Sequence, residues 1–264
     1  KTNQCSVTEF FGGRKQETIS CYGSAGMYQS AEKYAEEAVA VCELGFEAYK
    51  FRPALGPAED LRTVELMREA LGEDVGLCLD AHAWWRMGDA SYSSAIVEFL
   101  AEAISMHEIT WLEEPLRWED DKRCLKELSK RTMIPLSGGE SELTSYGCRS
   151  LIEEQAIQIL QFDCTMFGGF THGKKLVSIC ELNHIDVAPH HDCYIHASLV
   201  ASTAAGRFLE SFPDPERDPL QAELFENPHK IKDGIMYLNE EPGLGLKLSD
   251  VALKKYAKPV YNSN

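Results

Sequence analysis

The sequence predicts an α/β fold, a (β/α)7β TIM-like barrel, and three observations support this prediction. Eight short apolar runs alternate with seven amphipathic segments at about thirty residues per unit, which is typical of right-handed βαβ units in a parallel sheet. No Gly-x-Gly-x-x-Gly motif follows the first run, so an open dinucleotide-binding sheet has no support. The second to eighth runs each end in an ionisable side chain, as expected of a barrel whose active site lies at the C-terminal ends of its strands.

The expected strands are the short apolar runs at residues 18–21, 48–52, 75–80, 110–113, 134–137, 157–163, 185–189 and 207–210. The first helix follows Ser30, a preferred N-cap residue, has apolar positions at the 3.6-residue period, and ends at Gly45. Pro57 opens the second helix and Gly72 stops it. Similar amphipathic patterns predict helices at residues 94–106, 120–131, 147–155, 173–182 and 196–205.

The alternation of strands and helices stops at about Gln221. Residues 14–221 are therefore expected to form the barrel, and residues 222–264, which include the run PGLGLKLSD, to form an appendage. The chain has 264 residues, of which 44% are hydrophobic, so it holds enough apolar material for one sizeable domain.

The acidic composition argues against polyanionic partners. A formal net charge of −16 and a pI of about 4.9 describe a surface that repels nucleic acid and anionic membranes. We therefore expect a small-molecule partner, with no nucleic acid and no membrane. A protein this acidic needs local cations, either side chains or a metal, to bind an anionic substrate.

Cysteine usage predicts a reducing compartment. The nine cysteines are scattered and form no Cys-x-x-Cys pair, which favours free thiols over a zinc ribbon or a disulfide framework. No apolar run reaches the length of about eighteen residues that a membrane span requires, and the start of the sequence has no signal-peptide core. The expected location is the cytoplasm.

Three carboxylates stand at the ends of consecutive expected strands. Asp80 and Glu113 end the third and fourth strands and Glu140 follows the fifth, so their side chains are expected to converge. Carboxylates packed together repel one another unless a cation neutralises them. Oxygen ligands without a nearby thiolate favour Mg²⁺. The alternative for any one of these acids is a solvated or salt-bridged loop residue.

Lys50 and Arg52 lie two residues apart on the second strand, so they point to the same face. If that face is the barrel interior, they supply the local positive charge; the alternatives are a surface pair or inward charges neutralised by carboxylates. Arg52 does not serve as a base, because a guanidinium stays protonated. For Lys50 we favour an electrostatic clamp over a base with a lowered pKa.

Asp163 and His190 end the adjacent sixth and seventh strands. A neighbouring carboxylate fixes the tautomer of an imidazole and raises its basicity, which indicates a general base. His191 is the alternative partner if the register differs by one residue. We assign His172, His184 and His229 to structural or surface positions.

Two further strand-end residues are candidates for the site. His82 lies two residues past Asp80 and is a metal ligand, a general acid or a packed rim residue. Glu210, on the eighth strand, either hydrogen-bonds a developing enolate or pairs with a cation. Trp84 and Trp85 are expected to pack at the rim.

The ordered motifs resemble the mandelate racemase branch of the enolase superfamily. These motifs are Lys50-x-Arg52, LDAH, WLEEPL, PLSGGE, LQFD followed by FGG, APHH and LES. The resemblance implies one Mg²⁺ per active site on Asp80, Glu113 and Glu140. It also implies an Asp163–His190 dyad and a carboxylate, Glu210, at the end of the eighth strand.

Departures from the family pattern refine the expected chemistry. The family often carries Lys-x-Lys where this chain has Lys50-x-Arg52, which argues against two-base racemisation and is similar to sugar-acid dehydratases of the branch. Asp80-x-His82 is similar to galactonate-type dehydratases, in which the histidine is the general acid. The GGES context is similar to rhamnonate- and lyxonate-type members.

The resemblance also bears on domain organisation. Family members carry an N-terminal α+β capping domain, which is largely missing from this chain; residues 1–13 resemble its last segment, and residues 222–264 the tail that packs on it. Family members commonly form dimers or octamers, so a homo-oligomer is expected.

The predicted function is a lyase, a hydro-lyase that dehydrates a sugar acid to a 2-keto-3-deoxy acid. His190 removes the C2 proton, and either His82 or protonated His190 assists the leaving 3-hydroxyl. The alternatives are a racemase or epimerase of a hydroxy acid, with Lys50 and His190 as its two bases, and a non-catalytic binding barrel.

Overall fold

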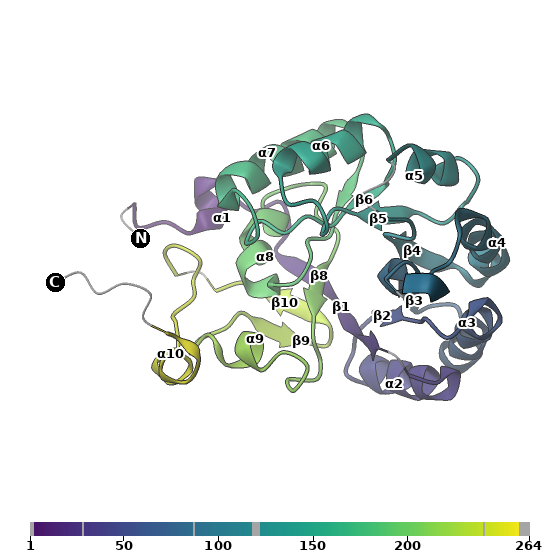
Figure 1. Ribbon diagram of the computed structural model, residues 1–264. Coiled ribbons are helices and arrows are strands. Elements are labelled where there is room, and N and C mark those ends of the chain that lie inside the picture. The colour runs from purple at the N-terminus through teal and green to yellow at the C-terminus, as the bar shows by residue number, and fades with distance from the viewer. Residues whose placement is uncertain (1–2, 28, 87, 118–121, 240, 259–264) are drawn as a thin grey trace.

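The computed structural model describes residues 3–27, 29–86, 88–117, 122–239 and 241–258 (Figure 1). Its main feature is a row of parallel strands with helices α2 to α7 around their outer side. The strands are β1 (Thr18–Met27), β2 (Ala48–Arg52), β3 (Gly76–Asp80), β4 (Ile109–Glu113), β5 (Leu136–Gly138), β6 (Ile159–Leu160), β7 (Asp186–Val187) and β8 (Leu209–Ser211).

The strand order is that of a (β/α) barrel. Strands β1 to β7 pair in sequence, each parallel to the next, and β8 pairs with β1 on its other side. A parallel bridge between Val187 and Gly206 joins β7 to the chain entering β8, with backbone bonds from Val187 N to Ala205 O (2.7 Å) and from Arg207 N to Val187 O (2.9 Å). This bridge connects the two ends of the row.

The helices begin where the sequence places capping residues. The Ser30 hydroxyl accepts a hydrogen bond from Lys33 N at the start of α2, and Pro57 is the first residue of α3. The helices are α1 (Val7–Phe10), α2 (Ala31–Glu43), α3 (Pro57–Leu71), α4 (Ser94–Ile104), α5 (Lys122–Ser129), α6 (Ser145–Glu153), α7 (Gly169–Leu182), α8 (Cys193–Ala201), α9 (Pro219–Glu223) and α10 (Asp250–Tyr256).

The inside of the barrel is filled by one side chain from most strands. Tyr22, Ala48, Cys78, Trp111, Ile159 and Ala188 form this buried cluster. The Tyr22 and Trp111 rings meet edge to face at 5.1 Å, a favoured aromatic geometry. Burying a large apolar side chain contributes about 1.5–3 kcal/mol, so this layer is a stable floor under the strand ends.

Several element boundaries differ from the sequence prediction. Strand β1 continues to Met27, and β6 and β7 are shorter than expected. Beyond the β6 ladder the chain stays bonded to its neighbours, by Gln161 N to Gly138 O (2.8 Å) and His190 N to Phe162 O (3.2 Å). The last helix begins and ends earlier than residues 196–205, and residues 120 and 121 of the expected fourth helix lie outside the described residues.

The segment after the barrel packs against the first strand. Strands β9 (Lys230–Lys232) and β10 (Ile235–Tyr237) form a hairpin, and β10 pairs antiparallel with the start of β1. Near the start, Ser6 forms a bridge with Gly243. The assignment of these segments to a capping domain and its tail stays a prediction. Among the described residues, no helix combines the length and the apolar character needed to cross a bilayer.

Candidate active site

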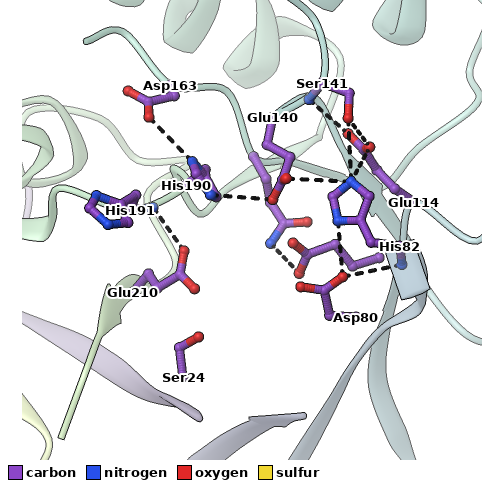
Figure 2. Close-up of polar contacts among 12 residues, drawn as sticks. Ser24, Asp80, His82, Glu114, Glu140, Ser141, Asp163, His190, His191 and Glu210 are labelled. Atoms are coloured by element: carbon purple, nitrogen blue, oxygen red, sulfur yellow. Dashed lines mark hydrogen bonds and ion pairs between the residues drawn. The ribbon is translucent and has the colours of Figure 1, made fainter. Parts of the chain in front are cut away.

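Three carboxylates from neighbouring strands meet at the carboxyl end of the barrel. Asp80 is the last residue of β3, Glu113 is the last residue of β4, and Glu140 follows β5 after one glycine. Figure 2 shows Asp80 and Glu140 on either side of His82. Together with His82, the three carboxylates offer ligand atoms that all lie within 4.8 Å of one another. Acids this close repel one another without a cation, so the cluster is suited to binding a metal.

A glycine turn delivers Glu140 to this cluster. Gly139 has a φ of +125°, which L side chains rarely adopt, and a Cβ there would lie 3.0 Å from Leu160 Cδ1. Burial raises the pKa of Glu140 to about 7; the positive charges of His82 and His190 oppose the rise, and the negative charges of Asp80 and Glu113 add to it. Glu140 is therefore the least well neutralised acid of the three.

Lys50 lies beneath the carboxylates and is fully buried. Its Nζ is 3.0 Å from Glu113 Oε1, 3.0 Å from Glu210 Oε1 and 3.7 Å from Asp80 Oδ2. Burial alone would lower the pKa of Lys50, but the charges of Glu113 and Glu210 outweigh burial and raise it. Lys50 is therefore a fixed cation.

Arg52 closes the same side of the site. Its Nε is 2.7 Å from Asp80 Oδ2, and its terminal nitrogens donate to Ala25 O (3.1 Å) and Ser24 Oγ (3.2 Å). The inward placement of both cations agrees with their spacing along β2. Lys50 and Arg52 therefore supply the local positive charge that an acidic protein needs to bind an anionic substrate.

The partner of Asp163 is His190 and not His191. His190 Nδ1 lies 3.2 Å from Asp163 Oδ2, and its other nitrogen, Nε2, lies 3.4 Å from Glu140 Oε2 (Figure 2). Asp163 is held by the Thr165 amide (2.8 Å) and hydroxyl (2.6 Å). Burial alone would raise the pKa of Asp163, but the hydrogen bonds from His190 and Thr165 lower it to about 2.

The free face of His190 points toward the carboxylates. Burial alone would lower the pKa of His190, but the Asp163 hydrogen bond and the charges of Glu140 and Glu210 raise it to about 9. The His190 side chain is 28% exposed, whereas those of Asp80 and Glu113 are 1% and 0% exposed. The acids therefore lie at the bottom of the site and His190 lies nearer its mouth.

His82 is enclosed by acids. The Asp80 carboxylate caps the 3-10 turn Ala81–Trp84, and His82 Nδ1 lies 3.0 Å from Asp80 Oδ1. His82 Nε2 lies 2.7 Å from Glu114 Oε2 and 3.4 Å from Glu140 Oε1. Burial opposes protonation, but the hydrogen bonds to Asp80 and Glu114 raise the pKa of His82 to about 11. His82 is thus a cation with both ring nitrogens engaged.

Glu210 pairs with cations and holds the loop after β7. Glu210 Oε1 lies 3.0 Å from Lys50 Nζ and 3.5 Å from Arg52 Nη2. Its other oxygen, Oε2, accepts a hydrogen bond from His191 N at 2.8 Å. The His191 ring turns away to Asp218, with Nε2 2.7 Å from Asp218 Oδ2. The alternative register, with His191 as the partner of Asp163, is therefore wrong.

The remaining histidines and tryptophans take structural positions. His172 Nδ1 meets Ser145 Oγ at 2.6 Å, His184 is exposed, and His229 Nδ1 accepts from Asn239 N at 3.1 Å. Trp84 is buried, and Trp85 Nε1 donates to Glu114 O at 2.8 Å. These contacts agree with the sequence assignments.

The sequence analysis did not predict three residues of the site, Glu114, Gln161 and Ser24. Glu114 accepts hydrogen bonds from Gly139 N (3.0 Å), Ser141 N (3.1 Å) and Ser141 Oγ (2.6 Å), so it fixes the loop that carries Glu140. Gln161 Nε2 donates to Glu113 Oε2 at 2.9 Å. Its two-residue spacing from Asp163 was a signal that both share a face. Ser24 lies on the part of β1 that the sequence did not predict.

Comparison with known proteins finds relatives that are similar over most of this chain. D-galactarolactone cycloisomerase of Agrobacterium fabrum is 26% identical over 96% of this chain and 69% of its own length. D-xylonate dehydratase of Haloferax volcanii is 27% identical over 91% of this chain and 62% of its own length. This chain thus spans less than two thirds of the dehydratase.

A solved structure shows the same fold. L-talarate dehydratase from Polaromonas sp. JS666, crystallised with Mg and L-glucarate, superposes with a TM-score of 0.84 at 25% identity, over 96% of this chain and 68% of that one. The enolase C-terminal domain-like family model matches residues 33–252, which include the three acids, both cations and the Asp163–His190 pair. The chain therefore belongs to the enolase C-terminal domain-like family.

Proposed function

We propose that this chain forms the catalytic barrel of a magnesium-dependent sugar-acid dehydratase, a hydro-lyase that abstracts the proton next to the carboxylate. The observation that carries the proposal is the arrangement of one buried acid cluster, two fixed cations and a histidine–aspartate pair around a single site. The similarity to D-xylonate dehydratase and to L-talarate dehydratase supplies the reaction class.

The residues present fit a magnesium ion. Asp80, Glu113 and Glu140 would hold it, because hard carboxylate oxygens are the ligands that Mg²⁺ takes. Burial disfavours the charge of Glu140, which a divalent cation would relieve. Beside the cluster, Gln161 Oε1 is buried without a hydrogen-bond partner among the described residues. Such an atom needs a water or ligand to satisfy it.

When bound, Mg²⁺ would supply Lewis-acid stabilisation of the negative charge that develops on the substrate carboxylate. Lys50 and Arg52 add two preorganised positive charges in a site where little water screens them. Interactions of this kind accelerate the reaction because they are stronger in the transition state than in the ground state.

His190 is the proposed general base. Asp163 holds its Nδ1, so Nε2 is the nitrogen available to take the C2 proton. The raised pKa of His190 depends in part on the charge of Glu140. A metal ion bound to Glu140 would offset the negative charge of that carboxylate. The pKa of His190 would then fall, which favours the neutral imidazole that a base requires.

Protonated His190 is also the better candidate for the general acid. The His190 side chain is 28% exposed and its Nε2 lies 3.4 Å from Glu140 Oε2, whereas His82 Nε2 lies only 2.7 Å from Glu114 Oε2. A leaving hydroxyl would have to displace that carboxylate to reach His82. We therefore propose that His82 acts as a fixed cation beside the acids and that His190 returns its proton to the 3-hydroxyl, releasing water.

Two-base racemisation fits the geometry less well. It would need Lys50 as a neutral base, and Lys50 is buried between Glu113 and Glu210 with a raised pKa. A lactone cycloisomerase is a second candidate function, because D-galactarolactone cycloisomerase is 26% identical to this chain over 96% of this chain and 69% of the cycloisomerase. Mass spectrometry separates the two: a dehydratase product has lost one water, and a cycloisomerase product keeps the substrate mass.

The test is proton exchange at C2. The chain is incubated in D₂O with Mg²⁺ and an acid-sugar library, and deuterium at C2 and 2-keto product are measured. We expect His190→Asn to lower exchange by a factor on the order of 100 or more. His184→Asn is the matched control, because His184 is an exposed histidine. Its backbone has a φ of +55°, and asparagine tolerates this conformation.

The outcomes are distinct. Exchange that persists in His190→Asn would move the base to Lys50 or His82. Magnesium binding without exchange or product from any sugar acid would favour a binding barrel. Which sugar acid is used, the dimeric or octameric state and the cytoplasmic location stay predictions.

A further inference from the structure

A buried histidine outside the site has both ring nitrogens committed to backbone atoms. His196 lies on α8 and is 0% exposed. Its Nε2 lies 3.1 Å from Cys164 N, and its Nδ1 lies 3.3 Å from His191 O. An amide N–H only donates and a carbonyl only accepts, so Nδ1 carries the proton and Nε2 is bare. The surroundings therefore fix His196 as one neutral tautomer.

These two backbone atoms flank the residues of the proposed base. Cys164 directly follows Asp163, and His191 directly follows His190. The ladder between β6 and β7 pairs only two residues of each strand, and two backbone bonds follow it, from Ala188 N to Leu160 O (3.0 Å) and from His190 N to Phe162 O (3.2 Å). His196 adds a side-chain bridge between the two strand ends just after the Asp163–His190 pair.

The chain after His190 is strained and needs such support. His191 has a φ of +54° and Asp192 a φ of +30°, consecutive left-handed conformations in residues other than glycine. Conformations of this kind cost on the order of 1–3 kcal/mol each and persist only when surrounding contacts hold them. At His191, the amide donates to Glu210 and the carbonyl accepts from His196. Loss of either contact frees the backbone to relax.

The bridge leaves the Asp163 carboxylate free for His190. Thr165 donates two hydrogen bonds to Asp163 Oδ1, and His190 meets Oδ2. His196 Nε2 lies 3.5 Å from Oδ1 but holds no proton to share with it. Burial lowers the pKa of His196, in agreement with a neutral ring.

We propose that His196 is a positioning residue, which fixes the distance and angle between Asp163 and His190 by tying the backbone after β6 to the backbone after β7. The catalytic consequence rests on the proposed function of His190. The structural claim itself is testable without turnover.

The first measurement uses the unaltered chain with Mg²⁺. Long-range proton–nitrogen NMR of the imidazoles reports which ring nitrogen of each histidine carries a proton. We expect His196 as the neutral Nδ1–H tautomer at neutral pH, and slow exchange of the Cys164 amide proton, which His196 accepts. A proton on Nε2 of His196, or a rapidly exchanging Cys164 amide, would overturn the proposal without any variant.

The second measurement compares His196→Leu with His196→Gln. Leucine fills the space but makes neither bond, whereas the glutamine amide offers both a donor and an acceptor. Thr203→Val is the control, because Thr203 is also buried and makes two hydrogen bonds, to Glu181 Oε1 (2.6 Å) and from Ala205 N (3.2 Å). These bonds lie past the end of α8, away from the Asp163–His190 pair.

The readouts separate positioning from simple stability. We expect His196→Leu to shift or broaden the His190 Nδ1–H signal and to lower C2 exchange on the order of 100-fold with KM unchanged, because small misplacements of a reacting group have effects of this size. His196→Gln should restore both. Thr203→Val should lower Tm and change neither.

The contrary result is equally clear. If His196→Leu lowers Tm as Thr203→Val does while the His190 signal stays in place, His196 has only a structural role. If His196→Leu does not fold, the tautomer of the unaltered chain and the His196→Gln variant still decide the question. If no sugar acid is turned over, only the proposed function fails, because the NMR readouts need no substrate.

Discussion

Replacing Glu140 by glutamine should stabilise the metal-free protein at alkaline pH. The pKa of Glu140 rises from 4.5 to about 7, chiefly because burial disfavours its charge. Each pKa unit corresponds to 1.36 kcal/mol, so the charged form costs about 3 kcal/mol in the folded state. Between pH 4.5 and 7 the folded state binds more protons than the unfolded state at this group. Its contribution to the free energy of unfolding therefore falls as pH rises through this range.

Magnesium should offset most of this difference in stability between the unaltered chain and Glu140→Gln. A ligand that binds only the folded state at 100 times its Kd adds about 2.7 kcal/mol to the free energy of unfolding. We expect the unaltered chain to gain stability of this order with Mg²⁺ at pH 8. Glu140→Gln should start up to about 3 kcal/mol more stable without the metal and gain little from it.

Urea unfolding at pH 5 and pH 8, with and without Mg²⁺, measures all of these quantities. The control is Glu142→Gln, an acid two residues further that pairs with Lys122 Nζ at 3.0 Å and lies outside the cluster. Glu142→Gln should keep the full response to Mg²⁺. The reasoning fails if Glu140→Gln is less stable than the unaltered chain at pH 8 without metal and still responds to Mg²⁺ as Glu142→Gln does.

Two further predictions concern the segment after the barrel. Burial, aided by the charge of Arg14, lowers the pKa of His229 from 6.5 to about 4. The folded state therefore binds fewer protons here, and the free energy of unfolding should fall by about 3 kcal/mol as pH drops from 6.5 to 4. His229→Gln should flatten this part of the stability–pH curve, and an unchanged curve would contradict the assignment. Gly234 has a φ of +68°, and a Cβ there would lie 2.6 Å from Gly45 O. Gly234→Ala should therefore destabilise by more than the roughly 1–3 kcal/mol expected from strain alone in Gly72→Ala, where φ is +71° and no atom lies within 4 Å of the added carbon. Equal midpoints of urea unfolding for the two variants would show that the close approach at Gly234 has no energetic weight.

The sequence predicted helices well because their ends have local signals. Ser30 and Pro57 mark helix starts through interactions within the next few residues, and the structure has both. Strand β1 was harder, because Gly23, Ser24 and Gly26 are poor strand formers. Gly23 and Ser24 are extended in the structure because neighbouring strands pair with them, whereas Gly26, with a φ of +61°, lies in the irregularity between Ser24 and Met27. Ser24 was missed as a result.

The site was predictable where strand periodicity applies and unpredictable where the backbone departs from it. Lys50 and Arg52 share a face because they alternate along β2. Glu114 has a φ of +39°, so it does not follow the pleat of β4 and instead reaches Ser141 and His82. His196 gave no signal in the sequence, because its partners are backbone atoms of other elements.

The charges in the site lead to one last prediction, that magnesium binding releases protons. Only two permanent cations, Lys50 and Arg52, face the acids of the site, which leaves an excess of four negative charges; the six acids are Asp80, Glu113, Glu114, Glu140, Asp163 and Glu210. Without metal, protons offset much of this excess, since the pKa of His82 is raised to about 11, that of His190 to about 9 and that of Glu140 to about 7. A divalent cation carries the charge that these protons supply and competes with them. Calorimetric titration with Mg²⁺ at pH 7, in buffers of different ionisation enthalpy, should therefore show a heat that depends on the buffer. A heat that is the same in every buffer would mean that the acids bind the metal without giving up protons, and the charge balance argued for this site would be wrong.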